Sequence, residues 1–194
     1  MDVGDIQYAI WCDCISRGVR IIVPNVHLLL ACEQDVLAVT QAGYAEEFEI
    51  KTSVSDFQAD FRKRVGWGRS ALKHDILAGR VDMGKWTLPR RFWFVVPAEI
   101  ADQVKGEVPD HAGLMVAVPP GGRVPPGGGG GVPRGRPVVL LTRVKGAPVV
   151  GGARKLPPAM LARLCGSLAW RYWPLWREQR EQREQWESKL SINR

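Results

Sequence analysis

The sequence of 194 residues contains no long hydrophobic run. No stretch approaches the roughly 18 uninterrupted apolar residues of a membrane-spanning helix, so no membrane partner is expected. The start of the sequence also lacks a basic segment followed by an apolar one, so a secretory signal is not expected. Together, these two absences predict a cytoplasmic protein.

Cysteine is scarce, and its spacing is not that of a zinc site. The sequence has C-x-C at Cys12 and Cys14, one further cysteine nearby at Cys32, and Cys165 far downstream. Structural zinc sites have pairs of ligands at two- to four-residue separations, in sets of four. We therefore expect reduced thiols that pack in the core, with metal binding as the less favoured alternative.

What the sequence does contain is an ordered series of short apolar runs and amphipathic stretches. Its hydrophobic fraction of 45% is ordinary for a globular protein, and its length suffices for a hydrophobic core. The patterns predict an α/β protein. Strands are expected at residues 33–40, around 49, and at 91–97, 113–118 and 138–144, with a shorter extended segment at 20–24. Helices are expected at residues 5–17, from 55, within 70–77, at 98–104 and from 157 to about 190.

Two parts of the chain are expected, an α/β domain at residues 1–156 and a helix at residues 157–194. Within the first, residues 119–137 hold six prolines and eight glycines, which predicts a flexible loop. The helix is rich in tryptophan, and we expect a bend at Pro174.

The strand around residue 49 has a charged face and an apolar face. Alternate residues of a strand share a face, so Glu49 and Lys51 point one way while Phe48 and Ile50 point the other. This spacing places a carboxylate beside an ammonium group over an apolar underside. Exposed strands also carry such pairs by chance, and the E-x-K spacing by itself is unspecific.

The preceding strand, at residues 33–40, is expected to place two further acids opposite Glu49 and Lys51. Residues 41–43 suit a three-residue hairpin loop with Gly43 in the left-handed conformation. Paired residue numbers then sum to 84, so Asp35 faces Glu49 and Glu33 faces Lys51. Directly opposed residues have Cβ atoms roughly 4.5–5.5 Å apart, and two acids that close repel unless a cation lies between them. Mg²⁺ is the expected cation, because it binds a few carboxylate oxygens and keeps several waters.

The next helix is expected to begin at Ser55, with Gln58 completing a capping box, and its amides point toward anions. Lys63, Lys73 and His74 are candidates for contact with phosphate groups. The alternatives are solvated charges for the two lysines and a structural hydrogen bond for His74.

Charge is distributed unevenly along the chain. Residues 1–133 hold 14 Lys/Arg and 16 Asp/Glu, whereas residues 134–194 hold 13 Lys/Arg and 4 Asp/Glu. A near-neutral part with an acidic centre and a basic tail suits a polyanion that the tail holds. Alternatively, the basic tail aids solubility. Its tryptophans either stack on single-stranded bases or are buried against the sheet, which is the preferred interpretation.

The order of these features resembles the PD-(D/E)xK nuclease superfamily, in which a helix precedes an acid-bearing strand, an E-x-K strand, a helix and a further strand. The resemblance extends over about residues 30–145. It includes EQDVLAVTQAGYAEEFEIKTSVSDFQADFRK at 33–63, KHDIL at 73–77, PRRFWFVVP at 89–97 and VPDHAGLMVA at 108–117. These segments are similar to compact nuclease-like proteins of phages and bacterial mobile elements and to MmcB-type DNA repair proteins.

The resemblance implies a restriction-endonuclease-like core, a mixed sheet flanked by helices, and a site for Mg²⁺ or Mn²⁺. Asp35 and Glu49 would bind the metal together with the Ile50 backbone carbonyl. Lys51 would orient or deprotonate the attacking water. Many members also carry an acid on the first helix, where this sequence offers only Asp5 or Asp13, and Glu33 is the alternative ligand.

The sequence thus predicts a metal-dependent DNA nuclease, expected to be an endonuclease, that acts in DNA repair, recombination or phage DNA processing. Its expected location is the cytoplasm of a bacterial or phage-infected cell. One alternative is a non-catalytic DNA-binding module of a repair complex that kept the nuclease fold. Another is an interaction protein that uses its tryptophan-rich helix. The oligomeric state is left open, with a homodimer as one alternative.

Overall fold

The structure of the chain is a computed structural model that describes residues 1–65, 70–82, 84, 86–119 and 139–192, with side chains up to residue 182. Except for Pro119, the predicted loop at residues 119–137 lies outside the described residues. The chain divides into two units, Met1–Leu156 and Pro157–Arg194, and each is described by itself below.

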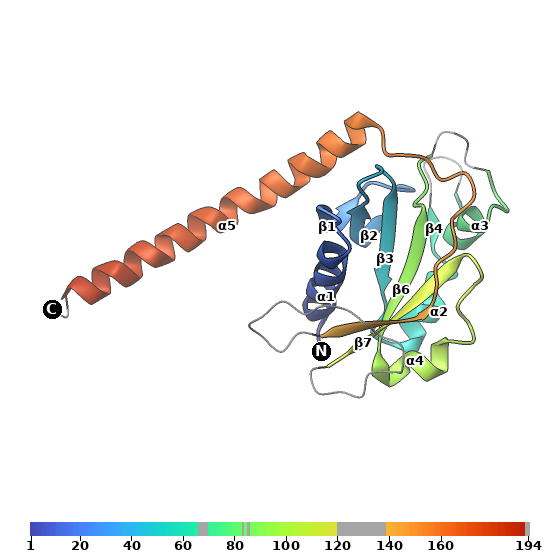
Figure 1. The fold of residues 1–194 in the computed structure, drawn as a ribbon, viewed down its shortest axis with the longest axis horizontal. Helices are drawn as coiled ribbons and strands as arrows, with labels where there is room; N and C mark the ends of the chain where they lie inside the picture. The colour runs from blue at the N-terminus through green and yellow to red at the C-terminus, as the bar shows by residue number, and fades with distance from the viewer. Residues whose placement is uncertain (66–69, 83, 85, 120–138, 193–194) are drawn as a thin grey trace. The chain divides into compact units, whose positions relative to one another are not determined.

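A mixed sheet of six strands forms the centre of the first unit (Figure 1). Its order is β1-β2-β3-β6-β7-β8, in which β3, β6 and β7 run parallel and the other neighbours pair antiparallel. The prediction of an α/β fold is therefore confirmed. The strands are β1 (Ile21–His27), β2 (Glu33–Val39), β3 (Ala45–Ile50), β6 (Arg91–Pro97), β7 (Ala112–Val118) and β8 (Leu140–Lys145), and a separate small sheet pairs β4 (Arg64–Val65) with β5 (Ala71–Leu72).

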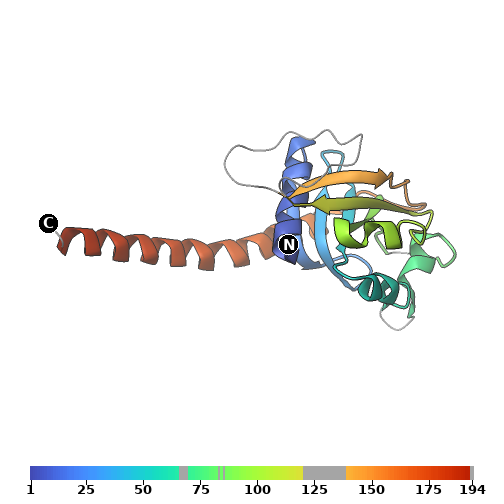
Figure 2. The ribbon, with the colours of Figure 1, turned by 90° about the horizontal axis from the view of Figure 1, so that it is seen from below.

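Helices cover the two faces of this sheet differently. Helix α1 (Val3–Ser16) packs on one face, where Ile6 and Ile10 join a core that includes Phe48 and Trp93. The opposite face carries a second core, to which α2 (Val54–Asp60), α3 (Lys73–Leu77) and α4 (Ala98–Val104) contribute buried residues. Figure 2 shows the sheet from a direction in which α1 is separated from the layer of α2, α3 and α4. β3 and β6 lie between the layers, which explains why both strands are almost wholly buried.

The hairpin that joins β2 to β3 has the predicted register. Val36 pairs with Phe48 and Leu37 with Glu47, so paired numbers sum to 84. At the loop, Gly43 has a φ of +84° and donates a hydrogen bond to the Thr40 carbonyl at 2.8 Å. Only glycine adopts this left-handed conformation without a steric cost, so one residue fixes the alignment of both strands.

The turn between β1 and β2 is held by one buried side chain. The Gln34 Oε1 accepts hydrogen bonds from the backbone amides of Leu28 and Leu29 at 3.0 and 3.2 Å. Its Nε2 donates to the carbonyls of Leu29 and Cys32 at 2.8 and 2.7 Å. Leu30 in this turn has a positive φ of 53°, and the chain reverses here before β2 begins.

Two boundaries differ from those predicted. Helix α2 is capped by Ser53, whose Oγ accepts from the Asp56 amide at 3.2 Å, and not by Ser55. β3 ends at Ile50, and Ser53 is the first serine after it. The short helix predicted within residues 70–77 begins only at Lys73, because residues 71 and 72 belong to β5.

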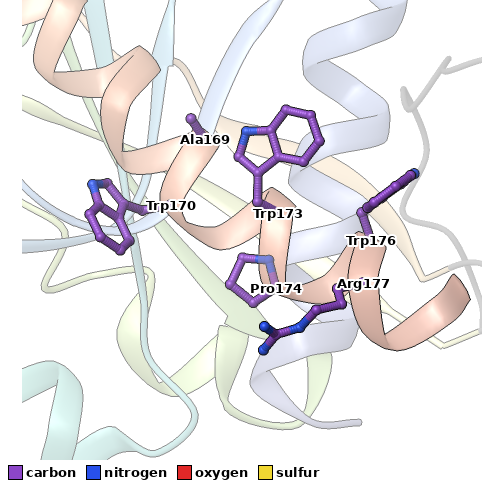
Figure 3. Close-up of a pocket in the computed structure, with 6 residues that line it drawn as sticks. All are labelled: Ala169, Trp170, Trp173, Pro174, Trp176 and Arg177. Atoms are coloured by element: carbon purple, nitrogen blue, oxygen red, sulfur yellow. The ribbon is translucent and has the colours of Figure 1, made fainter. Parts of the chain in front are cut away.

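The second unit is the helix α5 (Pro158–Ile192), which runs through Pro174 without interruption. Trp170, Trp173 and Trp176 are 82%, 60% and 42% exposed. They border a shallow pocket of about 520 Å³ together with Ala169, Pro174 and Arg177 (Figure 3). Among the described residues, no helix is long and apolar enough to cross a membrane.

Candidate functional site

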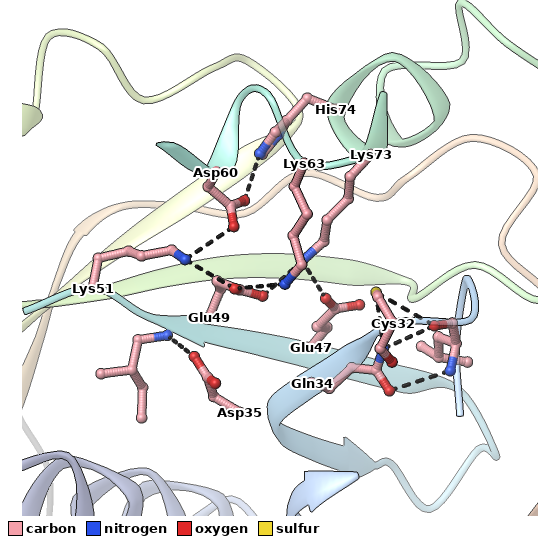
Figure 4. Close-up of polar contacts among 12 residues, drawn as sticks. Cys32, Gln34, Asp35, Glu47, Glu49, Lys51, Asp60, Lys63, Lys73 and His74 are labelled. Carbon is pink, nitrogen blue, oxygen red and sulfur yellow. Dashed lines mark hydrogen bonds and ion pairs between the residues drawn. The ribbon is translucent and has the colours of Figure 1, made fainter. Parts of the chain in front are cut away.

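The E-x-K pair lies on the sheet face that α2 and α3 cover (Figure 4). Phe48 and Ile50 belong to the core under α1, so Glu49 and Lys51 point to the opposite face, as the alternation predicted. The Lys51 Nζ donates to the Glu49 Oε1 at 3.0 Å. Both side chains are nearly inaccessible to water, with 8% and 3% of their surface exposed.

Three ammonium groups surround the carboxylate of Glu49. Lys51 and Lys63 lie 3.0 and 3.2 Å from its Oε1, and Lys73 lies 2.6 Å from its Oε2. Burial favours the neutral acid, but the neighbouring cations, Lys73 foremost, outweigh it and lower the pKa of Glu49. The side chain is therefore ionised at neutral pH and held by charge-assisted contacts.

Lys73 is the most deeply buried of these cations. Its side chain has no exposed surface, and its Nζ also lies 2.8 Å from the Glu47 Oε1 and 4.6 Å from the centre of the Phe92 ring. Burial opposes its charge, but Glu47 and Glu49 raise its pKa well above the usual value. The prediction that Lys73 contacts a phosphate of DNA is not supported, because no part of the side chain reaches the surface.

Glu47, which the sequence analysis did not single out, is also fully buried. Burial raises its pKa, and Lys73 only partly offsets this effect. Neither of its carboxylate oxygens accepts a hydrogen bond from the described residues. Glu47 and Lys73 therefore form an ion pair, but the angles between them are unfavourable for a hydrogen bond.

The pairs of the hairpin end at Val36 and Phe48, so Asp35 and Glu49 lie one residue beyond the last pair, and the predicted pair of Asp35 with Glu49 is not among them. The Asp35 Oδ2 accepts from the Ile50 amide at 2.7 Å. Its pKa is raised, first by burial and then by the charge of Glu49. The two acids therefore repel each other, which is the situation that a bound cation would relieve.

The Ile50 carbonyl points to the same side of β3 as Asp35. The next amide, that of Lys51, donates to the Val95 carbonyl on β6 at 3.0 Å. In a planar trans peptide the carbonyl points opposite to the amide hydrogen, so the Ile50 oxygen points away from β6 and toward β2. The structure thus brings two of the predicted ligands, Asp35 and the Ile50 carbonyl, to one side of the strand.

The other predicted acids lie elsewhere. Glu33 is half-exposed and lies 3.7 Å from the His27 ring, so it is not brought to Lys51. On α1, Asp5 takes part in the capping box with Asp2, and Asp13 is 2.8 Å from Arg17. Neither helix acid is therefore available as a ligand beside Glu49.

Asp60 is a member of the site that sequence reasoning missed. Its Oδ1 lies 3.0 Å from the Lys51 Nζ and its Oδ2 lies 2.8 Å from the His74 Nε2. Burial acts to raise its pKa, but the His74 contact and the lysines lower it strongly. Asp60 comes three residues after the buried Phe57, and this helical spacing was the signal that both face the sheet.

His74 is buried between Asp60 and His111. Its Nδ1 lies 2.9 Å from the His111 Nε2, and its ring packs against Phe61 and Phe94 with centroid distances of 4.8 and 5.6 Å. This geometry matches the structural alternative for His74 and does not support a direct phosphate contact. Of the three predicted phosphate contacts, Lys63 alone keeps an appreciable exposed surface, 32% of its side chain.

The predicted metal site can be tested against this geometry. Among the described residues, no group of three or more His, Cys, Asp or Glu side chains could hold a metal ion. The predicted set instead consists of two carboxylates and one carbonyl, the oxygen donors that Mg²⁺ binds together with water. Asp35 and the Ile50 carbonyl fit this role, whereas the Glu49 oxygens could accept a metal only after Lys51 or Lys63 moved away.

Comparisons with known proteins identify the fold and no activity. No protein-family model matches the chain, and no curated protein matches its sequence. A similar solved structure is that of the SPO1766 protein of unknown function from Silicibacter pomeroyi, with a TM-score of 0.52, 17% identity and coverage of 94% of each chain. At this identity the similarity shows a shared fold alone.

Proposed function

We propose that the chain is a metal-dependent DNA nuclease with a restriction-endonuclease-like core, in line with its resemblance to the PD-(D/E)xK superfamily. The observation that carries the proposal is the set of contacts at the end of β3, where the Asp35 Oδ2 accepts from the Ile50 amide at 2.7 Å and the Lys51 ammonium lies 3.0 Å from Glu49. The element order supports it as well. α1 is followed by the acid-bearing β2, the E-x-K strand β3, α2 and then the parallel strand β6.

Asp35, Glu49 and the Ile50 carbonyl are the residues that would hold Mg²⁺ or Mn²⁺. When bound, such an ion would lower the pKa of a water nucleophile and stabilise negative charge on the leaving oxygen. The chain's own contribution comes mainly from Lys51. Burial acts against its charge, but Glu49 and Asp60 raise its pKa, so it remains an ammonium at neutral pH. Lys51 is therefore suited to orient water and attract the phosphate as a positive charge, and not to accept a proton.

DNA binding would depend on positive charge outside the buried cluster. Lys63 is partly exposed beside Glu49 and is positioned to meet a phosphate that approaches the site. Residues 134–194, with 13 Lys/Arg and 4 Asp/Glu, supply the wider attraction for a polyanion.

A second candidate is a non-catalytic DNA-binding module of a repair complex. The observation that favours it is the set of three ammonium groups around Glu49, since cations in this position compete with a metal ion. The helix acids, engaged in other contacts, favour it as well.

A cleavage assay separates the two candidates. The full chain would be incubated with duplex, single-stranded, flap and branched DNA in Mg²⁺ or Mn²⁺, alongside Asp35→Asn. Asparagine can still accept the hydrogen bond from the Ile50 amide but lacks the negative charge. We expect this variant to lower the cleavage rate on the order of 100-fold, while the exposed control Asp102→Asn leaves it unchanged.

The other outcomes are equally informative. Salt-dependent DNA binding without cleavage in either metal would support the non-catalytic module. Cleavage that Asp35→Asn, Glu49→Gln and Lys51→Met all leave intact would reject the proposed site. A chain that neither binds nor cuts nucleic acid would reject both candidates.

A further inference from the structure

A continuous chain of polar contacts leads from the E-x-K pair to a pocket on another side of the first unit. The Lys51 Nζ lies 3.0 Å from both Glu49 and the Asp60 Oδ1. The Asp60 Oδ2 then contacts the His74 Nε2 at 2.8 Å, and the His74 Nδ1 contacts the His111 Nε2 at 2.9 Å. Lys51 meets both carboxylates through its Nζ, whereas Asp60 and His74 each meet their two neighbours through different atoms. The five side chains thus form one connected series (Figure 4 shows all but His111).

His111 is the end of this series that meets solvent. It is half-buried just before β7 and borders a pocket of about 650 Å³. The pocket is lined by Ala78, Arg80 and residues 106–111. The opposite end of the series is buried beside β3, with Glu49 only 3% exposed. A residue at the surface is therefore linked to the proposed site through three intervening side chains.

The contacts admit one arrangement of protons when both histidines are neutral. An ionised Asp60 can only accept, so the His74 Nε2 must carry a hydrogen. The Nδ1 of a neutral His74 is then an acceptor, and the His111 Nε2 must donate to it. Burial, assisted by His74, Arg80 and Lys145 against the opposing charge of Asp110, lowers the pKa of His111 to about 4. His111 is thus the neutral donor that this arrangement requires.

Within the series, His74 is packed among aromatic side chains. The His74 ring lies against Phe61, Phe92 and Phe94, with centroid distances of 4.8, 5.6 and 5.6 Å. These rings flank the imidazole, while its two nitrogens meet Asp60 and His111. His74 therefore links His111 to Asp60.

We propose that His74 and His111 are positioning residues, which hold Asp60 in the orientation that keeps the Lys51 ammonium over Glu49. The role of Lys51 in cleavage rests on the proposed function, whereas the positioning itself does not. Without the His111 donor, the His74 Nδ1 loses its partner, and the ring is held by Asp60 and the surrounding aromatic side chains alone. Asp60 then has a less firmly oriented partner and holds Lys51 less firmly beside Glu49.

The test compares two substitutions of His111 by nuclear magnetic resonance. His111→Leu removes the donor, whereas His111→Gln retains an amide that can donate to the His74 Nδ1. In the wild type and His111→Gln, we expect the hydrogens of the His74 Nε2 and of the Lys51 ammonium to exchange slowly with water. In His111→Leu, where Asp60 still selects the Nε2–H tautomer of His74, we expect both exchange rates to rise about tenfold. His27→Gln, at an exposed histidine, is the matched control and should behave as the wild type.

Kinetics extend the test if the chain cleaves DNA. His111→Leu should lower kcat about tenfold with little change in KM, and His111→Gln should restore most of the loss. If His111→Leu does not fold, His111→Asn serves instead, because its amide is too short to reach His74.

The outcomes separate this inference from the proposed function. Spectra of His111→Leu that match the wild type, or equal effects of Leu and Gln, would overturn the positioning role. Expected spectra in a chain that cuts no DNA would uphold the positioning role and reject the nuclease.

Discussion

Lys73 offers the sharpest test of how the site is held together. Its side chain is fully buried, 2.8 Å from Glu47 and 2.6 Å from Glu49. Lys73→Met keeps much of the volume and the contact with Phe92 but removes the charge. Removal of one partner from a buried ion pair costs about 3–5 kcal/mol. For a unit of this size, about 4 kcal/mol corresponds to a fall in Tm of roughly 8–16 °C.

The loss should depend on pH with a definite sign. Burial already raises the pKa of Glu47 with Lys73 present, and loss of the cation raises it further. An acid with a raised folded-state pKa favours the folded state at low pH, and this contribution is lost as pH rises through that pKa. Lys73→Met should therefore be more destabilising at pH 8 than at pH 5, where Glu47 is closer to being protonated.

Urea denaturation followed by circular dichroism at both pH values measures these effects. The double variant Glu47→Gln and Lys73→Met should recover part of the loss, because it leaves fewer buried charges unpaired. Lys105→Met, at an exposed ion pair, should leave the free energy of unfolding unchanged. A loss below about 1 kcal/mol for Lys73→Met, or an equal loss at the two pH values, would refute the reasoning.

Three further outcomes are expected. Ser53→Ala should lower the free energy of unfolding by about 1 kcal/mol, while Ser55→Ala should have little effect, because Ser53 alone caps α2; equal losses would contradict this assignment. Gly113→Ala should cost about 1–3 kcal/mol in urea denaturation, because its Cβ would come within 2.4 Å of the Trp93 ring. An iodoacetamide time course should modify the exposed Cys165 well before the three buried cysteines, and simultaneous labelling would show that the core opens readily.

The sequence could predict those features that depend on short-range geometry. Strand alternation separated Glu49 and Lys51 from their apolar neighbours, and the left-handed glycine at Gly43 set the hairpin register. That register predicted Asp35 opposite Glu49, one pair beyond those that form, and the Asp35 Oδ2 accepts from the Ile50 amide at 2.7 Å. These inferences succeed because a strand has a fixed period of two and a tight loop permits few alignments.

The rest of the site depends on how helices pack over the sheet, which no local pattern specifies. Asp60 and His74 meet Lys51 and His111 only because α2 and α3 lie on β3 and β6. A lysine in a short polar segment is ordinarily exposed, and nothing in the sequence near Lys73 indicated complete burial. The prediction that Lys73 contacts phosphate is therefore not supported for a tertiary reason, namely two acids beneath α3 that pair with its ammonium.

The hydrogen bonds of the Gln34 side chain determine where the neighbouring Asp35 lies along the sheet. These four hydrogen bonds to the turn before β2 can form in one alignment of that strand. A slip by a single residue would break all four and move the Asp35 carboxylate away from the Ile50 amide, which lies 2.7 Å from it. Gln34 therefore fixes the alignment of β2 and so keeps the Asp35 carboxylate in place, although the charge of Glu49 repels it.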